Sequence, residues 1–336
     1  MSNRVLTISL FVFLSSLLLS ASSVARECAY PVRGIKTLND LKKIAHLNES
    51  DIDIGCIALI LEKERNPDLD VEKYNKLLDI MVLDIQNKIA YFGDNAVTDH
   101  RVRIINTYFF RAQKFQFDKE DPYAVKPSNR TLSGVMDTRN GSCWTLPLLY
   151  LSVAQRLHYP IYPVSAPQHI FLRYILPDKT YYNIEATNGG TGPDEEIIYT
   201  LEIPERGIRS GAYMRTMTYR EFLGEMIAEN ARYWLQKGSS EQNQEKQTKY
   251  FNKALGHFKL ALKLEPNGAE IYHSTAMTCY TLHKRYKGIV SFLYFLDAQN
   301  YYTLMEVNGV AGRIKENYWV RQKERQNEFY QRGGNQ

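Results

Sequence analysis

A cysteine, a histidine and a glutamate follow one another in this chain in an order that supports thiol chemistry. Cys143 lies in the run Asn-Gly-Ser-Cys-Trp, directly before an apolar helical stretch, and His169 and Glu185 follow in strand-like segments. A thiol near its ordinary pKa is mostly protonated at neutral pH, but a helix N-terminus and an imidazolium can hold it as the thiolate. A carboxylate on the far nitrogen of the imidazole fixes the tautomer and stabilises the charged ring. These residues therefore predict a nucleophile, a base and an orienting acid.

The stretch after the cysteine predicts a core-facing helix. Apolar residues recur at helical spacing from Leu146 to Leu157. Pro147 is tolerated only in the first turn of a helix, so the helix is expected to begin close to Trp144. Cys143 is then placed at the N-terminal edge of the helix, where the helix dipole is positive.

Three short segments beyond this helix predict strands, because they are rich in β-branched and aromatic residues and are bounded by proline or Asp-Lys turns. They are residues 161–164, 170–175 and 181–184. Alternate residues of a strand share a face. Asn183 and Glu185 are therefore expected to point the same way, and either can reach His169.

Helical spacing dominates the remainder. Residues 35–90 and 99–113 carry apolar residues at helical intervals, with a turn and capping signal at Asn66-Pro67-Asp68. The segment 204–212, with one proline and two glycines, predicts a linker. Everything beyond that linker is expected to be helical.

Residues 219–336 predict a region of paired helices. The run 251–282 has small residues at the helix contacts and a Pro-Asn turn between two helices, as is typical of a tetratricopeptide repeat. Because such stacks normally need three repeats, divergent copies are expected on either side. A concave face near Tyr272 and Tyr280 is predicted to bind a protein partner, with an intramolecular cover for the rest of the chain as the alternative.

The first 25 residues predict an export signal. Arg4 precedes an apolar run from Val5 to Ala21, and Ser-Val-Ala at 23–25 is typical of a cleavage site. The run is short and contains serines, which favours a cleaved signal over an uncleaved membrane anchor. The mature chain is therefore expected to be exported, without stable insertion in a membrane.

The cysteine positions leave open whether the chain contains a disulfide bond. In an oxidising compartment, Cys28 and Cys56 either pair and pin the N-terminal segment, leaving Cys143 free, or remain unrelated buried thiols like Cys279. The seven histidines show no spacing with cysteines or carboxylates that indicates a metal site, and no cofactor is predicted.

The charge balance is close to even. Loss of the leader removes one arginine and no acid, so the formal charge falls from +5 to +4. So small a surplus does not indicate binding to nucleic acid. Basic residues gather in the last 24 residues, which favours a solvated helix face over a partner or membrane surface.

Four blocks around the three candidate residues resemble the transglutaminase-like superfamily, and specifically its bacterial SirB-type branch. The blocks are residues 132–143, 149–157, 164–174 and 183–190. The resemblance implies an α+β, papain-like core, with a helical N-terminal part and a central cysteine helix packed on a small antiparallel sheet. This core is expected over residues 26–215, and the all-α tetratricopeptide-like region over residues 219–336. A bacterial periplasmic or secreted location is implied with it.

By this resemblance, Cys143 matches the nucleophile of the family and His169 its base. Glu185 stands sixteen residues after the histidine, where the family usually has aspartate, and Asn183 is the alternative third member. Two further departures are Gln168 and His158, at positions where glycine is common in the family. Gln168 and Trp144 are candidates for the substrate site, although Trp144 can equally pack on the core.

Two functions from different classes follow. The first is an exported cysteine enzyme that forms a thioester from an amide or peptide carbonyl. Hydrolysis would make it a thiol protease or amidase, and transfer to an amine would make it an acyltransferase. The second is a non-catalytic scaffold of the same fold, whose repeats mediate protein–protein binding.

Overall fold

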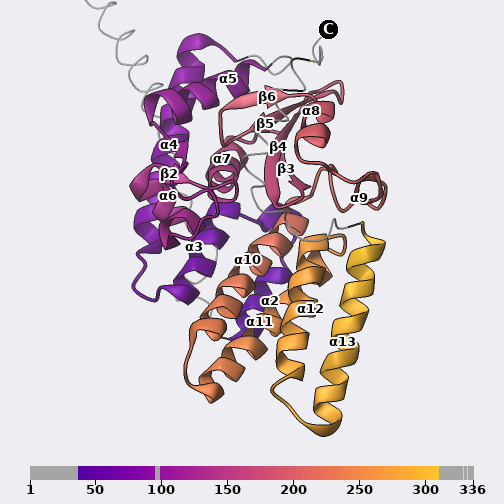
Figure 1. The fold of residues 1–336 in the computed structure, drawn as a ribbon. Helices are drawn as coiled ribbons and strands as arrows, with labels where there is room; N and C mark the ends of the chain where they lie inside the picture. The colour runs from indigo at the N-terminus through magenta and orange to yellow at the C-terminus, as the bar shows by residue number, and fades with distance from the viewer. Residues whose placement is uncertain (1–36, 95–98, 310–327, 329–330, 332–336) are drawn as a thin grey trace, which may run out of the picture.

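The computed structural model describes residues 37–94, 99–309, 328 and 331 (Figure 1). The expected leader, residues 1–25, lies outside the described residues, as do Cys28 and most of the basic C-terminal residues. Cys56 is disulfide-bonded, whereas Cys143 and Cys279 are free thiols. Since Cys28 is not described, its pairing with Cys56 stays a prediction.

The N-terminal part is helical, as predicted. Its elements are α2 (Leu38–Ala45), η1 (Glu49–Asp51), α3 (Ile54–Arg65), α4 (Val71–Phe92), α5 (His100–Asn106) and the π-helical η2 (Thr107–Ala112). Asp53 and Asp70 cap α3 and α4 by accepting hydrogen bonds from backbone N–H groups two or three residues into the helix. The break between these helices falls at the predicted Asn66-Pro67-Asp68 turn. Helix α3 is buried from Ile54 to Glu62, so it forms the centre of this layer.

Short elements connect this layer to the candidate site. They are β1 (Gln116–Phe117), η3 (Pro127–Arg130), α6 (Leu132–Thr138) and β2 (Asn140–Gly141), and β1 and β2 pair in parallel. Helix α7 (Thr145–Arg156) follows directly and is buried along almost its whole length. It begins next to Trp144, as the position of Pro147 predicts. At its other end, Arg156 donates hydrogen bonds to Asp53, Asn75 and Asp79 and so ties α7 to α3 and α4.

The main sheet is antiparallel, in the order β3-β4-β5-β6. Its strands are β3 (Ile161–Ala166), β4 (His169–Ile175), β5 (Tyr181–Glu185) and β6 (Gly190–Gly192), and the first three confirm the predicted strands. Leu172 pairs with Ile184, so their side chains share the face that packs into the core with α7. Pro163 is tolerated because β3 is the edge strand.

The opposite face of the sheet is covered by the segment expected to be a linker. Residues 194–214 form α8 (Asp194–Thr200), α9 (Glu205–Arg209) and a turn. Ile203, Ala212 and Tyr213 are buried there against Val164 and Phe171. The linker prediction for 204–212 is therefore wrong, because this segment forms α9 and packs against the sheet through Ile208 and Ala212.

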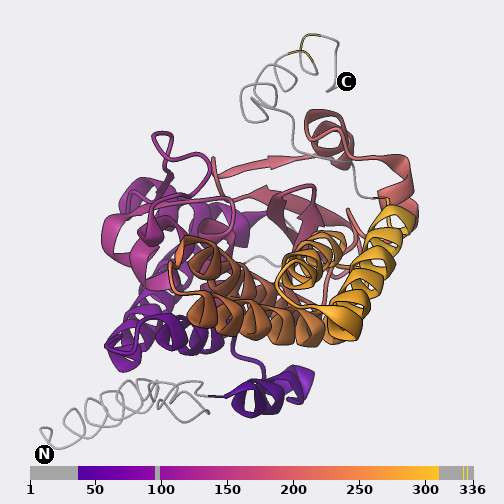
Figure 2. The ribbon, with the colours of Figure 1, turned by 60° about the horizontal axis from the view of Figure 1, so that its bottom comes forward.

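The C-terminal region is a stack of antiparallel helices, seen side by side in Figure 2. They are α10 (Tyr219–Ser240), α11 (Gln244–Leu264), α12 (Ala269–His283) and α13 (Gly288–Val307). The predicted helices are thus present, and the turn at Pro266-Asn267 separates α11 from α12. Their assignment to tetratricopeptide repeats stays a prediction.

The core continues from the N-terminal layer into α10 and α11. Glu49 accepts hydrogen bonds from the backbone N–H groups of Tyr219 and Arg220, at 2.6 and 3.0 Å, and thereby caps α10. The first two helices of the stack, α10 and α11, therefore belong to the same hydrophobic core as the N-terminal helices.

A buried carboxylate joins α3 to these helices. Glu64, with a side chain 3% exposed, is paired with Lys253 at 2.8 Å and with His257 at 3.2 Å, and also accepts from Asn230. Burial alone raises the pKa of Glu64, but the hydrogen bonds with His257 and Lys253 lower it to about 2. The carboxylate is thus held charged between the two layers.

Glu64→Gln is expected to lower the free energy of unfolding by about 2–4 kcal/mol at pH 7, because it leaves Lys253 and His257 without their anionic partner. The pKa of this carboxyl is depressed on folding, so its contribution is present above pH 4.5 and is lost as the pH falls toward 2. Urea unfolding at pH 7 and pH 3 measures both effects. Glu245→Gln, at an exposed position of α11, is the control. An equal loss of unfolding free energy in both variants would contradict the stabilising role of Glu64.

Candidate functional site

Cys143 lies in the first turn leading into α7. The Oγ atom of Ser142 accepts hydrogen bonds from the N–H groups of Trp144 (3.2 Å) and Thr145 (3.3 Å), and its carbonyl accepts the first helical bond, from Leu146. Ser142 therefore acts as the helix cap and satisfies N–H groups that would otherwise lack partners. This arrangement fixes Cys143 at the positive end of the helix, as expected from the sequence.

A buried asparagine holds this turn in place. The carbonyl of Asn129 accepts from Ser142 Oγ (2.9 Å) and from Thr145 Oγ1 (3.3 Å), and its side-chain amide donates to Asp118 (2.9 Å) and Asp121 (2.8 Å). The hydrogen bonds from Asn129 and Lys126 lower the pKa of Asp118. No role for residues 118–130 was predicted from the sequence; the closely spaced aspartates and asparagine of this stretch were the available signal.

The tip of the β3–β4 hairpin brings His169 to the cysteine. Ala166 pairs with His169, so Pro167 and Gln168 form a two-residue turn. The Cys143 thiol lies 3.6 Å from the carbonyl oxygen of Gln168. The site thus uses the backbone of Gln168, while its side chain is exposed.

Two residues near the site adopt a backbone conformation that favours glycine. Gln168 has φ +53° and His158, after the end of α7, has φ +57°. Both values lie in the left-handed region, which glycine adopts without steric cost. A glycine is therefore the ordinary residue at either place, and these side chains accept modest backbone strain.

The imidazole of His169 is buried between the thiol and Glu185. Its Nε2 atom lies 2.5 Å from Oε2 of Glu185, and the two side chains are 1% and 25% exposed. The ring is also hydrogen-bonded with the Cys143 side chain. Cysteine, imidazole and carboxylate therefore stand in contact in that order.

The electrostatics of this group favour the imidazolium. Burial alone lowers the pKa of His169, but the charge of Glu185 and the hydrogen bond with Cys143 raise it to about 10. Burial likewise raises the pKa of Glu185, yet His169 and Thr187 hold it below its ordinary value. At neutral pH the carboxylate is charged and supports a charged ring beside the thiol.

Thr187 fixes the carboxylate of Glu185. Its backbone N–H and its Oγ1 both donate to Oε1 of Glu185, at 3.0 and 2.7 Å. This leaves Oε2 directed at His169. The longer side chain of glutamate is thus folded back by a residue two positions further along the chain. Sequence reasoning missed Thr187, because nothing in its spacing distinguishes it from an ordinary turn residue.

The turn after β5 is braced by the last residue of α5 and by the π-helical η2. The Asn106 side chain donates to the carbonyl of Gly189 at 2.9 Å. Gly189 has φ +72°, and a Cβ atom there would lie 2.6 Å from the ring of Phe110. Glycine is therefore required at this position, both by its conformation and by close packing. The brace supports the turn that contains Thr187.

Two other predicted site residues lie away from the imidazole. Asn183 accepts from Arg173 (2.9 Å) and donates to Asp194 (2.7 Å), so it belongs to a polar cluster on the same face of the sheet and does not contact His169. The ring of Trp144 packs on Phe222 of α10, with 5.4 Å between the ring centroids, and is half-buried. The structure thus places Trp144 in a core contact that adjoins Cys143.

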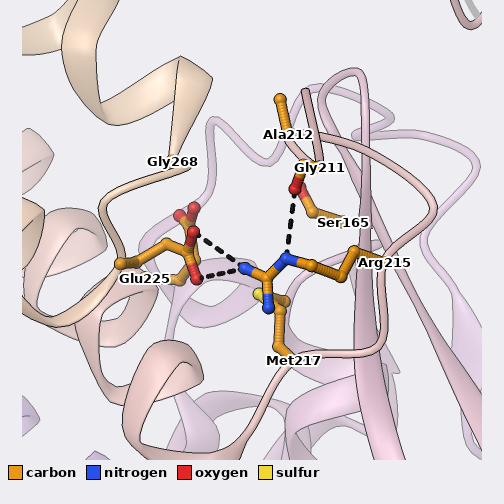
Figure 3. Close-up of a pocket in the computed structure, with 8 residues that line it drawn as sticks. Ser165, Gly211, Ala212, Arg215, Met217, Glu225 and Gly268 are labelled. Atoms are coloured by element: carbon orange, nitrogen blue, oxygen red, sulfur yellow. Dashed lines mark hydrogen bonds and ion pairs between the residues drawn. The ribbon is translucent and has the colours of Figure 1, made fainter. Parts of the chain in front are cut away.

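A pocket lies between β3 and the C-terminal helices (Figure 3). It is lined by Ser165, Gly211, Ala212, Arg215, Met217, Glu225, Glu265 and Gly268. Arg215 donates to both oxygens of Glu265, at 3.1 and 3.0 Å. Burial raises the pKa of Glu265 to about 7, with Arg215 opposing it. This is an ion-pair junction that supports β3, separate from Cys143.

Within the described ranges, no three or more histidine, cysteine or acidic side chains gather as they would around a metal ion. None of the helices in those ranges has the length and apolar character needed to cross a membrane.

Part of this chain is similar to a known protein family. Residues 72–228 match a family model described as the transglutaminase-like superfamily. The matched range contains Cys143, His169 and Glu185, together with α7 and the main sheet, and ends within α10. The structure, with its many helices and small sheets, is consistent with such an α+β core joined to a helical region.

Two curated relatives and one solved structure are also similar. "UPF0162 protein" from two strains of Xylella fastidiosa, Temecula1 and 9a5c, is 24% identical over 164 residues, which covers 49% of this chain and 56% of each relative. The match thus spans about half the length of these relatives. A crystal structure of menin, described with its binding site for the Mixed Lineage Leukemia (MLL) protein, aligns with a TM-score of 0.41 and 11% identity. That alignment covers 81% of this chain and 72% of menin, and the similarity is too low to support an argument.

Thr187→Val is expected to slow alkylation of Cys143 by iodoacetamide at pH 7 by about tenfold. It removes the hydroxyl donor at 2.7 Å from Glu185 and frees the carboxylate to turn away from His169. Thr187→Ser keeps that donor and is the matched control. Equal rates in the valine and serine variants would contradict the positioning role.

Glu265→Gln is expected to reduce the pH dependence of stability. The pKa of Glu265 is raised on folding from 4.5 to about 7, so its contribution is complete below pH 4.5 and is lost as the pH rises through 7. Between pH 5 and pH 8, this group should therefore lower the free energy of unfolding of the wild type by about 1–3 kcal/mol, and the decrease should be smaller in the variant. Urea unfolding at each pH measures the slope; identical slopes would refute the assignment.

Proposed function

We propose that this chain is a transglutaminase-like cysteine enzyme acting on amides, with Cys143 as nucleophile, His169 as acid and base, and Glu185 as the orienting carboxylate. The observation that carries the proposal is the buried imidazole, which bonds Glu185 at 2.5 Å and contacts the thiol at the start of α7. A structural cysteine has no need of a charged, oriented imidazole beside it.

The first chemical step uses this geometry directly. The thiolate of Cys143 attacks an amide carbonyl, and a carbon–sulfur bond forms as the carbonyl electrons move to oxygen. The backbone N–H of Cys143 itself, at the positive end of α7, is suited to stabilise the resulting oxyanion, because the N–H groups of Trp144 and Thr145 are bonded to Ser142. His169 then gives its proton to the leaving nitrogen, the carbon–nitrogen bond breaks, and a thioester remains.

The second step regenerates the thiol. His169, now neutral, takes a proton from a water molecule or an amine, which attacks the thioester, and the carbon–sulfur bond breaks. Water yields hydrolysis, the reaction of a thiol protease or amidase, and an amine yields acyl transfer. The fixed Glu185 keeps the imidazole oriented and stabilises its charged form in both steps.

The setting we propose is an exported protein of the bacterial SirB-type branch, in the periplasm or the medium, with tetratricopeptide-like repeats that bind a protein partner. The leader-like residues 1–25 and the disulfide-bonded Cys56 support export. The stacked helices support partner binding, and Tyr280, which is 40% exposed, marks the predicted face. Tyr272 packs on Tyr301 and donates to the Pro266 carbonyl, so it contributes less to that face.

Selective alkylation tests the catalytic proposal. Iodoacetamide is expected to label Cys143 much faster than Cys279 between pH 6 and pH 8, since burial raises the pKa of Cys279 to about 12. His169→Ala is expected to slow the labelling of Cys143 at pH 6 by about tenfold to a hundredfold, because no imidazolium remains to stabilise the thiolate. Mass mapping of each cysteine measures both rates.

Glu185→Gln keeps the shape of the acid while removing its charge, and is expected to give an intermediate rate. Equally slow labelling of Cys143 in the wild type and in His169→Ala would overturn the proposed enzyme and favour the non-catalytic scaffold.

Deletion of residues 219–336 is unsuitable as a test of partner binding, because α10 and α11 contribute to the shared core. Tyr280→Ala leaves that core intact and is the suitable change for a test of partner binding.

A further inference from the structure

The outer face of α13 carries an unusual run of exposed apolar side chains. Those that are at least 40% exposed are Ile289, Val290, Phe292, Leu293, Leu296, Leu304 and Val307. The helix lies at the edge of the stack, away from the sheet (Figure 1). Isolated exposed apolar residues are ordinary on protein surfaces, but a contiguous stripe of them indicates an interaction site.

The spacing along this face is that of a helix–helix seam. Ile289, Leu293, Leu296, Asn300 and Leu304 follow one another at intervals of three or four residues, and Val307 continues the series. Such spacing keeps one stripe of side chains directed at a partner helix. The seam is therefore suited to an α-helix rather than to an extended peptide.

The opposite side of α13 is already occupied. Ala298 and Met305 are buried, and Tyr294 and Tyr301 pack with them against the inner helices. A helix that is apolar on all sides is ordinarily covered on all sides. The inner side of α13 is thus covered by neighbouring helices, and the outer seam is additional.

Charge placement points to a second copy of the same helix. Asp297 and Glu306 are the acidic residues of α13, which contains no lysine or arginine, and Asp297 is paired with Lys259 at 3.0 Å. The seam is therefore nearly neutral and can face itself without like-charge repulsion. Lys287, just before the helix, and Glu306, at its end, are both exposed.

These two charges also select the orientation. In an antiparallel pair, Lys287 of one copy lies near Glu306 of the other, and the two-fold axis passes close to Leu296. In a parallel pair, Lys287 would face Lys287 and Glu306 would face Glu306. Opposite charges at the ends of the seam thus favour the antiparallel arrangement.

We propose that two copies of this chain associate through the outer seam of α13, packed antiparallel about a two-fold axis near Leu296. The interface buries the apolar stripe that the stack leaves exposed and places Lys287 against Glu306 of the partner subunit at each end. This interaction is independent of the chemistry at Cys143.

Sedimentation equilibrium of the purified chain from residue 26 tests this pairing. The wild type is expected to be a dimer at micromolar concentration, and Leu296→Glu is expected to raise the dissociation constant about a hundredfold or more, because it places two carboxylates at the axis. Ile80→Glu, at a position of α4 that is 51% exposed, is the matched control and should leave the dimer unchanged. Circular dichroism checks that both variants stay folded.

A charge exchange tests the orientation. Lys287→Glu is expected to weaken the dimer at low salt, and the double variant Lys287→Glu with Glu306→Lys is expected to restore it. A monomer at all concentrations, or a dimer indifferent to Leu296→Glu, would overturn the proposal. So would a monomer that binds phospholipid vesicles through the seam. Failure of the double variant to recover affinity would overturn the antiparallel arrangement.

Discussion

The contact between the start of α7 and the tip of the β3–β4 hairpin is the constraint on which the site depends. Cys143 belongs to the helix and His169 to the hairpin, so a small shift of either element would separate thiol from imidazole. The helix is fixed at both ends, by Ser142 and Asn129 near the cysteine and by Arg156 at the C-terminus. Burial on both faces fixes the sheet. Reactive groups are therefore held on rigid elements rather than on loops.

The carboxylate of Glu185 is held in place by its local surroundings. The additional methylene of Glu185 would let the carboxylate adopt several positions, but two donors from Thr187 hold one oxygen and direct the other toward His169. The brace from Phe110 and Asn106 supports the same turn through Gly189. The flexible glutamate side chain is therefore directed at His169 by the hydrogen bonds of the turn that follows it.

The C-terminal helices have two different relations to the remainder of the chain. Helices α10 and α11 complete the core, through Glu49 at the start of α10 and the buried Glu64 between the layers. Helix α13, at the edge of the stack, leaves an apolar seam exposed. The stack thus contributes to the core through α10 and α11, whereas the exposed apolar residues lie on α13, the helix for which we propose association.

Periodicity in the sequence was sufficient to predict the strands, α7 and the C-terminal helices. The spacing of apolar residues and the turn residues between them determine which secondary-structure element forms. The prediction that Cys143 and His169 act together came from residue types and from the expected helix start, and the structure brings the two side chains together. The residue types alone did not decide between Glu185 and Asn183, because both side chains point to the same face of the sheet. Only the folded structure shows that Asn183 is hydrogen-bonded to Arg173 and Asp194. The linker predicted at 204–212 failed for the same reason: glycine and proline mark breaks in secondary structure, whereas tertiary contacts determine whether a segment is buried. Contacts distant in sequence, such as Asn129 with Ser142, exist only in the folded chain.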